Sequence, residues 1–561
     1  MTQRRAPVDR SIFPLGWGLL AVLPTLGILL ILLSGCLGAW RDSPPRDVIL
    51  LSVDTLRWDA LGIAGASRAD TPVIDDLAEE GTYFPNAFAP MPRTTPALGS
   101  LLTGLWPSGH GSREVGDPIR TEATTLAEIL KSRGFTTLAV SANDSASPKQ
   151  RLDQGFDRFV SYRDLVERQG GDLYRYPDSA ETDQPGWATV TTRAALELIR
   201  EESGSERLFL WVFYFDPHFV YRPPVPWQER SPAEKCHRLY DYYEQNRNEL
   251  GRLYADVGGV ASEALDHCRE LYRAEVAYTD AEIGNLLDGL ADAGRLRDAL
   301  VVFTADHGEN LGEWGLYFEH GDNVHDAALR IPLIFSGPGI AEGRRDRTAV
   351  SLVDVPPTVL SLLDVDASLH VDGTDLSSRL DPGTRPPVDP GRMVFAESGT
   401  PMWNEATEHV TTGREWGRIC INGPRYTLCE NPRKAPGELL LYDHVEDPAL
   451  TRNLADEKPK VVEELRRSWT SWPPETARQR TVRTARFKLV EFPRLDGTYE
   501  SKLFDLRDDP GETRDVKERY PEIHDRLQRA LEAWASNLPA PRDRPYDPEL
   551  EESLRALGYL K

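Results

Sequence analysis

The sequence predicts an α/β protein with a mostly parallel sheet, and three apolar runs are the main reason. These runs are residues 48–53, 208–215 and 300–303. Apolar runs of this kind are typical of strands that are buried on both faces, as in a parallel sheet. Segments with apolar residues at helical spacing lie between them, at 74–80, 126–133 and 271–290. Strands that alternate with helices in this way indicate an α/β fold.

A polar side chain follows each run at the point where the predicted strand ends. Asp54 follows the first, Asp216 and His218 follow the second, and Asp306 and His307 follow the third. In open α/β sheets, ligands bind beyond the carboxyl ends of the strands. We therefore expect Asp54, Asp306 and His307 to surround one point, where oxygen and imidazole donors favour a divalent metal. A single aspartate after a strand is more often a turn residue or cap, so the prediction depends on all three strands.

The N-terminus has the pattern of an exported and anchored chain. Three arginines in the first ten residues precede an apolar run over residues 11–37. Positive charge before such a run is typical of a chain whose start is held inside the cell. The run ends in Leu-Ser-Gly-Cys, which resembles a bacterial lipoprotein processing site with Cys36 as the lipidated residue. A single uncleaved membrane helix fits equally well. Either alternative predicts a membrane-anchored, extracytoplasmic protein of the cell envelope, with residues 1–45 as anchor and linker.

Charge narrows the classes of partner. The formal net charge of −24 argues against a nucleic-acid or polyanion binder, because such proteins need basic surfaces. A small anionic substrate held by a metal remains compatible with this negative net charge.

Four further cysteines form an even set, as expected for disulfides in an exported protein. Cys420 and Cys429 flank the hairpin signal Asn422-Gly423, so they could be cross-strand partners. Cys236 and Cys268 would close a polar insertion, residues 222–270, that could form a lid. The spacing leaves three connectivities open, and buried free thiols are a further alternative.

Several segments between residues 46 and 365 match one known family, in that family's own order. They include LLSVDTLRWDALG, TTPALGSLLTGLWPSGHG, TLAEILKSRGFTTLAVSAN, FDPH, VVFTADHGENLGE and RIPLIFSGPG. On these segments the chain resembles the sulfatase branch of the alkaline phosphatase superfamily. The resemblance implies an alkaline-phosphatase-like fold, with a mixed, mostly parallel sheet flanked by helices and a smaller C-terminal α+β subdomain. It also implies an ester hydrolase.

The nucleophile motif departs from the sulfatase pattern. Sulfatases carry Cys or Ser, then any residue, Pro, Ser and Arg, and the Cys or Ser is oxidised to formylglycine. The resemblance places Thr94 in that slot and Pro96 on the motif proline, while Ala97 and Leu98 replace Ser and Arg. Threonine cannot become formylglycine, so the sequence does not predict ordinary sulfatase chemistry.

Thr94 remains a plausible nucleophile on physical grounds. Pro96 and the leucines that follow it at helical spacing predict a helix that begins near Thr94. Exposed amides and the helix dipole favour negative charge at such a terminus. A threonine hydroxyl attacks readily only when a metal or a base activates it. The simpler alternative is that Thr94 only caps the helix.

The resemblance completes the predicted metal set as Asp54, Thr94, Asp306 and His307. This set is similar to that of lipoteichoic acid synthases and phosphoethanolamine transferases, which form a phosphothreonine intermediate. Thr55 stands where sulfatases often have a second Asp for calcium. Both departures favour phosphoryl or phosphonyl transfer. One divalent ion (Zn, Mn or Ca) is expected, because the spacing that holds a second zinc in two-zinc members is missing.

Four histidines are further candidates, and the resemblance separates them. His218 matches a position that contacts the substrate anion, and His320 lies next to the place of a basic active-site residue. Either could stabilise the anion or protonate the leaving group, although a structural role stays open for both. His110 is predicted to be a structural turn residue, and His325 to serve packing.

An internal repeat follows residue 400. Tyr442-Asp443 recurs as Phe504-Asp505 and Pro459 as Pro521, at a constant offset of 62 residues. Each unit is predicted to contain two strands, a turn and a helix that begins near its proline. The predicted divisions are 46–400 for the catalytic domain, 401–480 and 481–546 for the two repeats, and 547–561 for a tail.

The sequence therefore predicts a membrane-tethered, metal-dependent hydrolase of phosphate (including phosphodiester), phosphonate or sulfate esters, with Thr94 as nucleophile. The alternatives are a sulfatase that works without formylglycine, a phosphoglycerol- or phosphoethanolamine-type transferase, and an inactive binding protein. The transferase is less favoured, because those enzymes carry several membrane helices and this chain offers one such segment. The expected partners are a small anionic ester or a cell-envelope glycan or lipid, and the membrane through the anchor.

Overall fold

A computed structural model describes most of the chain after the predicted anchor. The described residues are 44–169, 186–202, 204–225, 227, 236, 257–313, 317–321, 323–366, 370–399, 412–415, 418–422, 425–430, 439–443, 446, 452–471, 478–493 and 498–538. The predicted anchor and the predicted tail lie outside them. Among the described residues, no helix combines the length and apolar character that a membrane crossing requires.

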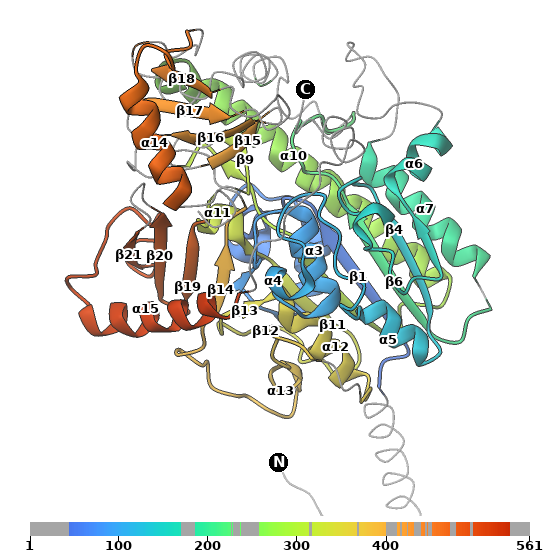
Figure 1. The fold of residues 1–561 in the computed structure, drawn as a ribbon. Helices are drawn as coiled ribbons and strands as arrows, with labels where there is room; N and C mark the ends of the chain where they lie inside the picture. Colours follow the sequence, from blue (N-terminus) through green and yellow to red (C-terminus); the bar gives the residue numbers. More distant parts are fainter. Residues whose placement is uncertain are drawn as a thin grey trace, which may run out of the picture. The chain divides into compact units, whose positions relative to one another are not determined.

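The largest sheet has eight strands and is mixed but mostly parallel, as predicted (Figure 1). In order across the sheet they are β12 (Arg344–Arg345), β2 (Gly81–Tyr83), β11 (Leu333–Ser336), β7 (Ala299–Ala305), β1 (Asp47–Val53), β6 (Leu208–Tyr214), β4 (Thr136–Ser141) and β5 (Arg158–Val160). The strands from β7 to β5 are parallel, and β11 is antiparallel to both its neighbours. Every residue of β1, β6 and β7 is buried, which explains why these strands are apolar throughout.

Helices pack on the sheet in two groups (Figure 1). The first group is α2 (Pro72–Glu79), α7 (Trp187–Glu201) and α10 (Val257–Asp292), in which α10 contacts both other helices. The second is α3 (Thr94–Thr103), α4 (Pro107–His110), α5 (Leu126–Ser132) and α12 (Val355–Leu362), all of which contact α3. The short helices α6 (Tyr162–Gln169), α11 (Asp326–Leu329) and α13 (Ser377–Leu380) complete this part.

The three predicted helices are present, and local sequence accounts for the start of α5. Thr125 and Glu128 form a capping box at the start of α5, in which each side chain accepts the other's backbone N–H. α10 is longer than predicted, because residues 257–270, which were expected to belong to a lid, are its first turns.

In the described part of the chain, four smaller antiparallel or mixed sheets lie outside the main one. A three-stranded sheet contains β10 (Arg330–Ile331), β3 (Ala87–Phe88) and β13 (Val350–Ser351). A second contains β15 (Thr412–Glu415), β16 (Arg418–Asn422), β17 (Tyr426–Glu430) and β18 (Leu439–Asp443). A third contains β14 (Val394–Glu397), β19 (Arg480–Arg483), β20 (Phe487–Pro493) and β21 (Tyr499–Asp505). The pair β8 (Asn310–Leu311) and β9 (Tyr317–Glu319) forms a hairpin, and β12 pairs at the edge of the main sheet.

The two four-stranded sheets have the same order of elements at the positions of the sequence repeat. In each, two antiparallel strands are followed by a helix that begins at the matched proline: α14 (Pro459–Ser471) and α15 (Pro521–Ser536). Leu527 and Leu531 of α15 join Val482, Leu489 and Leu503 in a separate small core. The third sheet also takes β14, from a segment that precedes both repeats in sequence.

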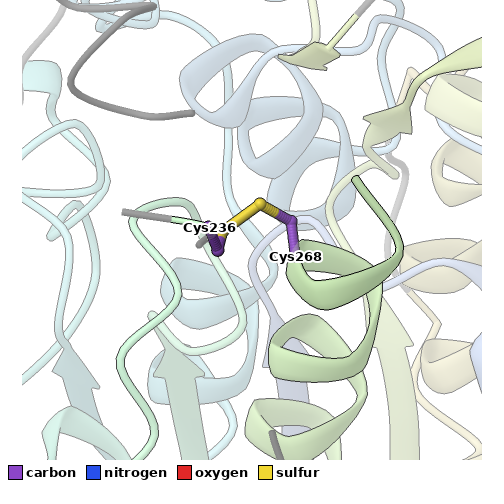
Figure 2. Close-up of a disulfide and its surroundings, with 2 residues drawn as sticks. All are labelled: Cys236 and Cys268. Carbon is purple, nitrogen blue, oxygen red and sulfur yellow. A yellow bond between two sulfur atoms is a disulfide. The ribbon is translucent and has the colours of Figure 1, made fainter. Parts of the chain in front are cut away.

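One disulfide joins Cys236 to Cys268 on α10, with 5.0 Å between the Cα atoms (Figure 2). The structure thus selects this pairing from the alternatives that the sequence left open. Cys420 of β16 lies opposite Cys429 of β17 in the antiparallel register, as the hairpin signal predicted. The side chains of these two cysteines are outside the described residues.

Candidate metal centre and active site

The carboxyl ends of adjacent parallel strands bring the predicted metal ligands together. Asp54 directly follows β1, and Asp306 and His307 directly follow β7, its neighbour in the sheet. All three side chains are buried. One ligand atom from each lies within 4.8 Å of the others. The predicted convergence of Asp54, Asp306 and His307 is therefore present in the structure.

Each carboxylate has one oxygen held in place and one oxygen without a hydrogen-bond partner. Asn143 Nδ2 donates to Asp54 Oδ2 at 2.6 Å. The backbone N–H groups of Thr55 and His307 donate to Asp306 Oδ1 at 3.2 and 2.7 Å. Asp54 Oδ1 and Asp306 Oδ2 accept no hydrogen bond from the described residues. These two oxygens lie 3.8 and 3.3 Å from His307 Nε2.

The His307 ring presents a lone pair to the same point. Its Nδ1 lies 2.9 Å from Gly308 O, and a carbonyl can only accept, so Nδ1 carries the proton. Burial lowers the pKa of His307, and the neighbouring His320 lowers it further, so the ring is neutral near pH 7. The lone pair of neutral imidazole on Nε2 is the form that binds a metal.

The electrostatics of this cluster fit a divalent cation. Burial and the nearby Asp306 carboxylate raise the pKa of Asp54, and burial also raises the pKa of Asp306. Two buried carboxylates side by side are unfavourable unless a positive charge compensates them. A divalent ion at the meeting point of the two oxygens and Nε2 would supply that charge. The donor set and its oxygens without hydrogen bonds thus fit one metal ion.

Thr94 lies at this point as the first residue of α3. Its Oγ1 is 3.3 Å from His307 Nε2. Arg93 occupies the N-cap position of α3, where no side chain forms a capping bond, so Thr94 does not have the capping role that was the alternative. The adjacent Thr95 has a structural role, because its Oγ1 donates to Ser145 O at 2.7 Å.

The two candidate histidines lie next to the metal ligands. The His320 ring lies against the His307 ring, with 4.4 Å between centroids and 33° between planes. The His218 ring meets His320 edge-on at 5.2 Å and stacks on Phe215 at 4.7 Å. Burial lowers the pKa of His218 to about 4, so His218 is neutral near pH 7. The structure therefore brings His218, His320 and the metal ligands into one cluster.

Sequence reasoning missed two residues of this cluster. Asn143, which fixes Asp54, lies two residues after β4, and the strand-end rule that found Asp54 could have found it. Glu309 is fully buried, and its Oε1 lies 3.3 Å from His320 Nδ1. Burial raises the pKa of Glu309 to about 8. Only its position shortly after His307 offered a signal in the sequence, so its contact with His320 required the tertiary structure.

Three other polar residues make contacts that are structural. Asp216 Oδ2 accepts a backbone N–H in the first turn of α7. His110 is buried against α3, and its Nε2 lies 3.1 Å from Pro96 O. His325 Nδ1 lies 3.1 Å from Glu512 Oε2. The contacts of His110 and His325 agree with the structural roles predicted for them.

The comparisons with known proteins point to one family. The family model described as Sulfatase matches residues 46–365. Arylsulfatase K of Xenopus laevis is 22% identical over 459 residues, which cover 76% of this chain and 82% of the relative. An ulvan-active sulfatase of Formosa agariphila is 27% identical over 429 residues, which cover 74% of this chain and 78% of that relative.

A solved structure has the same fold. The phosphonate monoester hydrolase of Silicibacter pomeroyi aligns with a TM-score of 0.58 at 21% identity, over 88% of this chain and 96% of that one. The chain therefore belongs to the sulfatase family, has the alkaline-phosphatase-like fold and is an ester hydrolase.

Proposed function

We propose that this chain is a metal-dependent hydrolase of phosphate, phosphonate or sulfate esters in which Thr94 is the nucleophile. The position of Thr94 Oγ1, 3.3 Å from His307 Nε2, is the observation that carries the proposal. The same nitrogen faces Asp54 Oδ1 and Asp306 Oδ2, the two oxygens without hydrogen bonds. Since threonine cannot be converted to formylglycine, its own hydroxyl is the group available for attack.

Each side chain of the site has its own role in the proposed reaction. Asp54, Asp306 and His307 hold one divalent ion, which when bound supplies Lewis-acid activation. Thr94 lies in the first turn of α3, whose first backbone N–H groups have no partner within the helix, so these groups and the helix dipole favour negative charge on its oxygen. His218 Nδ1 donates to Phe219 O at 2.6 Å, so the ring donates to the substrate anion when Nε2 is also protonated, the form that a bound anion favours. His320 protonates the leaving oxygen.

The proposed reaction has two displacement steps. In the first, Thr94 Oγ1 forms a bond to phosphorus or sulfur, and the bond to the leaving alcohol breaks. The hydroxyl proton of Thr94 goes to solvent, and the departing oxygen takes a proton from His320. In the second step, water attacks the same centre and releases phosphate, phosphonate or sulfate. The proton of that water goes to Thr94 Oγ1, and His320 recovers its proton from solvent.

Sulfate esters are a second candidate substrate class, because relatives across three quarters of the chain are named sulfatases. Phosphate and phosphonate esters are favoured by the Thr94 hydroxyl, since phosphothreonine hydrolysis needs no modified residue. A panel of aryl phosphate, phosphonate and sulfate esters, with metal analysis of the same samples, separates these classes. Turnover of sulfate esters alone would assign the chain to sulfatase chemistry without formylglycine.

The proposal includes attachment to the membrane at the cell envelope. It is supported by the arginines and apolar run of residues 11–37 and by the Leu-Ser-Gly-Cys sequence that ends at Cys36. The substrate is accordingly a small anionic ester or an ester on a cell-envelope glycan or lipid.

The decisive experiment replaces the nucleophile. Thr94→Ala should lower kcat by at least about a thousandfold, since the covalent step has no substitute, whereas Thr94→Ser should retain part of the rate. Thr95→Ala is the matched control, because it removes the neighbouring hydroxyl that binds Ser145 O. Rapid quenching with a slow substrate should trap phosphate on the Thr94 peptide, which mass spectrometry detects. Wild-type turnover by Thr94→Ala would exclude the covalent mechanism.

A further inference from the structure

The proposed active site needs a positive charge besides the metal. Asp54 and Asp306 together offset a divalent ion, so an incoming anionic ester meets no net positive charge from this set. At position 98, where the related motif carries arginine, this chain has a fully buried leucine. The charge that binds the anion must therefore come from another part of the chain.

Arg93 is placed to supply it. It directly precedes Thr94 and occupies the N-cap position of α3 with extended backbone, at φ −145° and ψ 137°. Its guanidinium lies against the backbone of Gly321, where an added Cβ would be 2.8 Å from Arg93 Cζ. Gly321 follows His320, whose ring lies against His307. The guanidinium is thus held between the helix that carries Thr94 and the segment that carries His320.

The surrounding backbone is built around this side chain. A Cβ on Gly399 would be only 1.8 Å from Arg93 Nε, so position 399 requires glycine while Arg93 occupies this place. Gly399 N also donates to Gly321 O at 2.6 Å, which joins the two glycine segments beside the arginine. Glycines from two distant parts of the chain therefore form a slot for one guanidinium.

The Glu114 carboxylate pairs with the guanidinium groups of both Arg93 and Arg478. Arg93 Nε lies 3.4 Å from Glu114 Oε2, and Arg478 Nη2 donates to Glu114 Oε1 at the shorter distance of 2.5 Å. Arg478 is 4% exposed and also donates to Ser398 O at 2.9 Å, so it is held firmly in place. The Arg93 side chain is 17% exposed. Glu114 therefore orients Arg93 while its charge is shared with Arg478.

We propose that Arg93 binds the phosphate, phosphonate or sulfate group of the substrate and takes the place of an arginine at position 98. A guanidinium suits this task, because its planar donors match the oxygens of a tetrahedral anion in a bidentate arrangement. This inference rests on the proposed function, because it assigns the anion site of the same reaction.

The test uses the full-length, metal-loaded enzyme and inorganic phosphate as the probe. Arg93→Met and Arg93→Gln should raise the Ki of phosphate and the KM of the ester by about 10- to 100-fold, as expected for loss of charged hydrogen bonds. Metal content and melting temperature should stay at their wild-type values. Arg68→Met is the control for loss of one positive charge, since Arg68 is 68% exposed and pairs with Glu270.

The outcomes separate this inference from the proposed function. Unchanged Ki and KM in either folded variant would overturn the role of Arg93, even if Thr94→Ala abolished turnover. Loss of metal or of the fold in both variants would also overturn it, because Arg93 would then serve the structure. Conversely, if Thr94→Ala kept the wild-type rate while Arg93→Met weakened phosphate binding, only the nucleophile would be wrong.

Discussion

Replacement of the buried Lys488 should destabilise the protein by about 3–5 kcal/mol, the typical cost of breaking a buried ion pair. Lys488 is fully buried in β20. Its Nζ donates to Val324 O at 2.6 Å, to Asp326 Oδ1 at 3.0 Å and to Glu512 Oε1 at 2.8 Å. Lys488→Met keeps the apolar volume but leaves a buried carbonyl and two buried carboxylates without this donor.

The remaining contacts show which carboxylate is more strongly affected when the Lys488 ammonium group is removed. Arg483 Nη1 donates to Asp326 Oδ2 at 2.6 Å, so Asp326 keeps a cationic partner in the variant. Among the described residues, Glu512 keeps weaker compensation, from His325 at 3.1 Å and the backbone N–H of Asp326 at 2.9 Å. We therefore expect Glu512 to account for most of the free-energy change.

The same change should weaken the metal site. Asp326 begins α11, and Ala328 O on that helix accepts the backbone N–H of Gly308 at 2.8 Å. Gly308 follows His307, and a Cβ there would lie 2.1 Å from Ala327 O, so the two segments are in direct contact. Loosening α11 therefore disturbs the backbone beside a metal ligand. Lys488 acts in this way as a positioning residue.

Urea denaturation followed by tryptophan fluorescence measures the change in unfolding free energy, and metal analysis measures occupancy. Lys502→Met is the matched control on neighbouring β21, where Nζ lies 5.4 Å from the centre of the Phe492 ring. That variant should cost less than about 1 kcal/mol. Adding Glu512→Gln should recover part of the loss, because it removes the uncompensated charge. A change below about 1 kcal/mol for Lys488→Met would refute the reasoning.

Three further predictions follow from the metal set, a buried histidine and the N-terminus. Asp306→Asn combined with His307→Ala should remove the metal and abolish turnover with little loss of fold; full metal occupancy in the double variant would contradict the ligand assignment. Burial lowers the pKa of His110 from 6.5 to about 3. Between pH 6.5 and pH 3 the unfolded chain therefore binds more protons than the folded protein, so the folded protein loses stability as the pH falls. Lowering the pH from 7 to 5 should reduce the unfolding free energy by about 2 kcal/mol through His110. In His110→Gln, denaturation curves should show a smaller fall in unfolding free energy over this pH range, and the same fall as in the wild type would contradict the prediction. Cys36→Ala should block lipidation and processing if the lipoprotein pattern is real, whereas unchanged mass and processing would favour the membrane helix.

The sequence alone determined the framework of this protein and the core of its candidate site. Apolar runs are a local property of buried strands, and the end of a strand is visible in the sequence. For that reason Asp54, Asp306 and His307 could be predicted at one edge of a parallel sheet. The proline in the first turn likewise located the start of α3 and hence Thr94.

Only the tertiary structure decided which side chains meet at that edge. The same strand-end pattern marked Asp216, yet its carboxylate accepts a backbone N–H at α7, while Asn143 contacts Asp54. Sequence periodicity specifies which face or end of an element a residue occupies, but not which neighbour it contacts there. The slot around Arg93 and the burial of Lys488 depend on segments hundreds of residues apart. Such contacts are set by how the sheets and loops pack, because no local pattern encodes the partner.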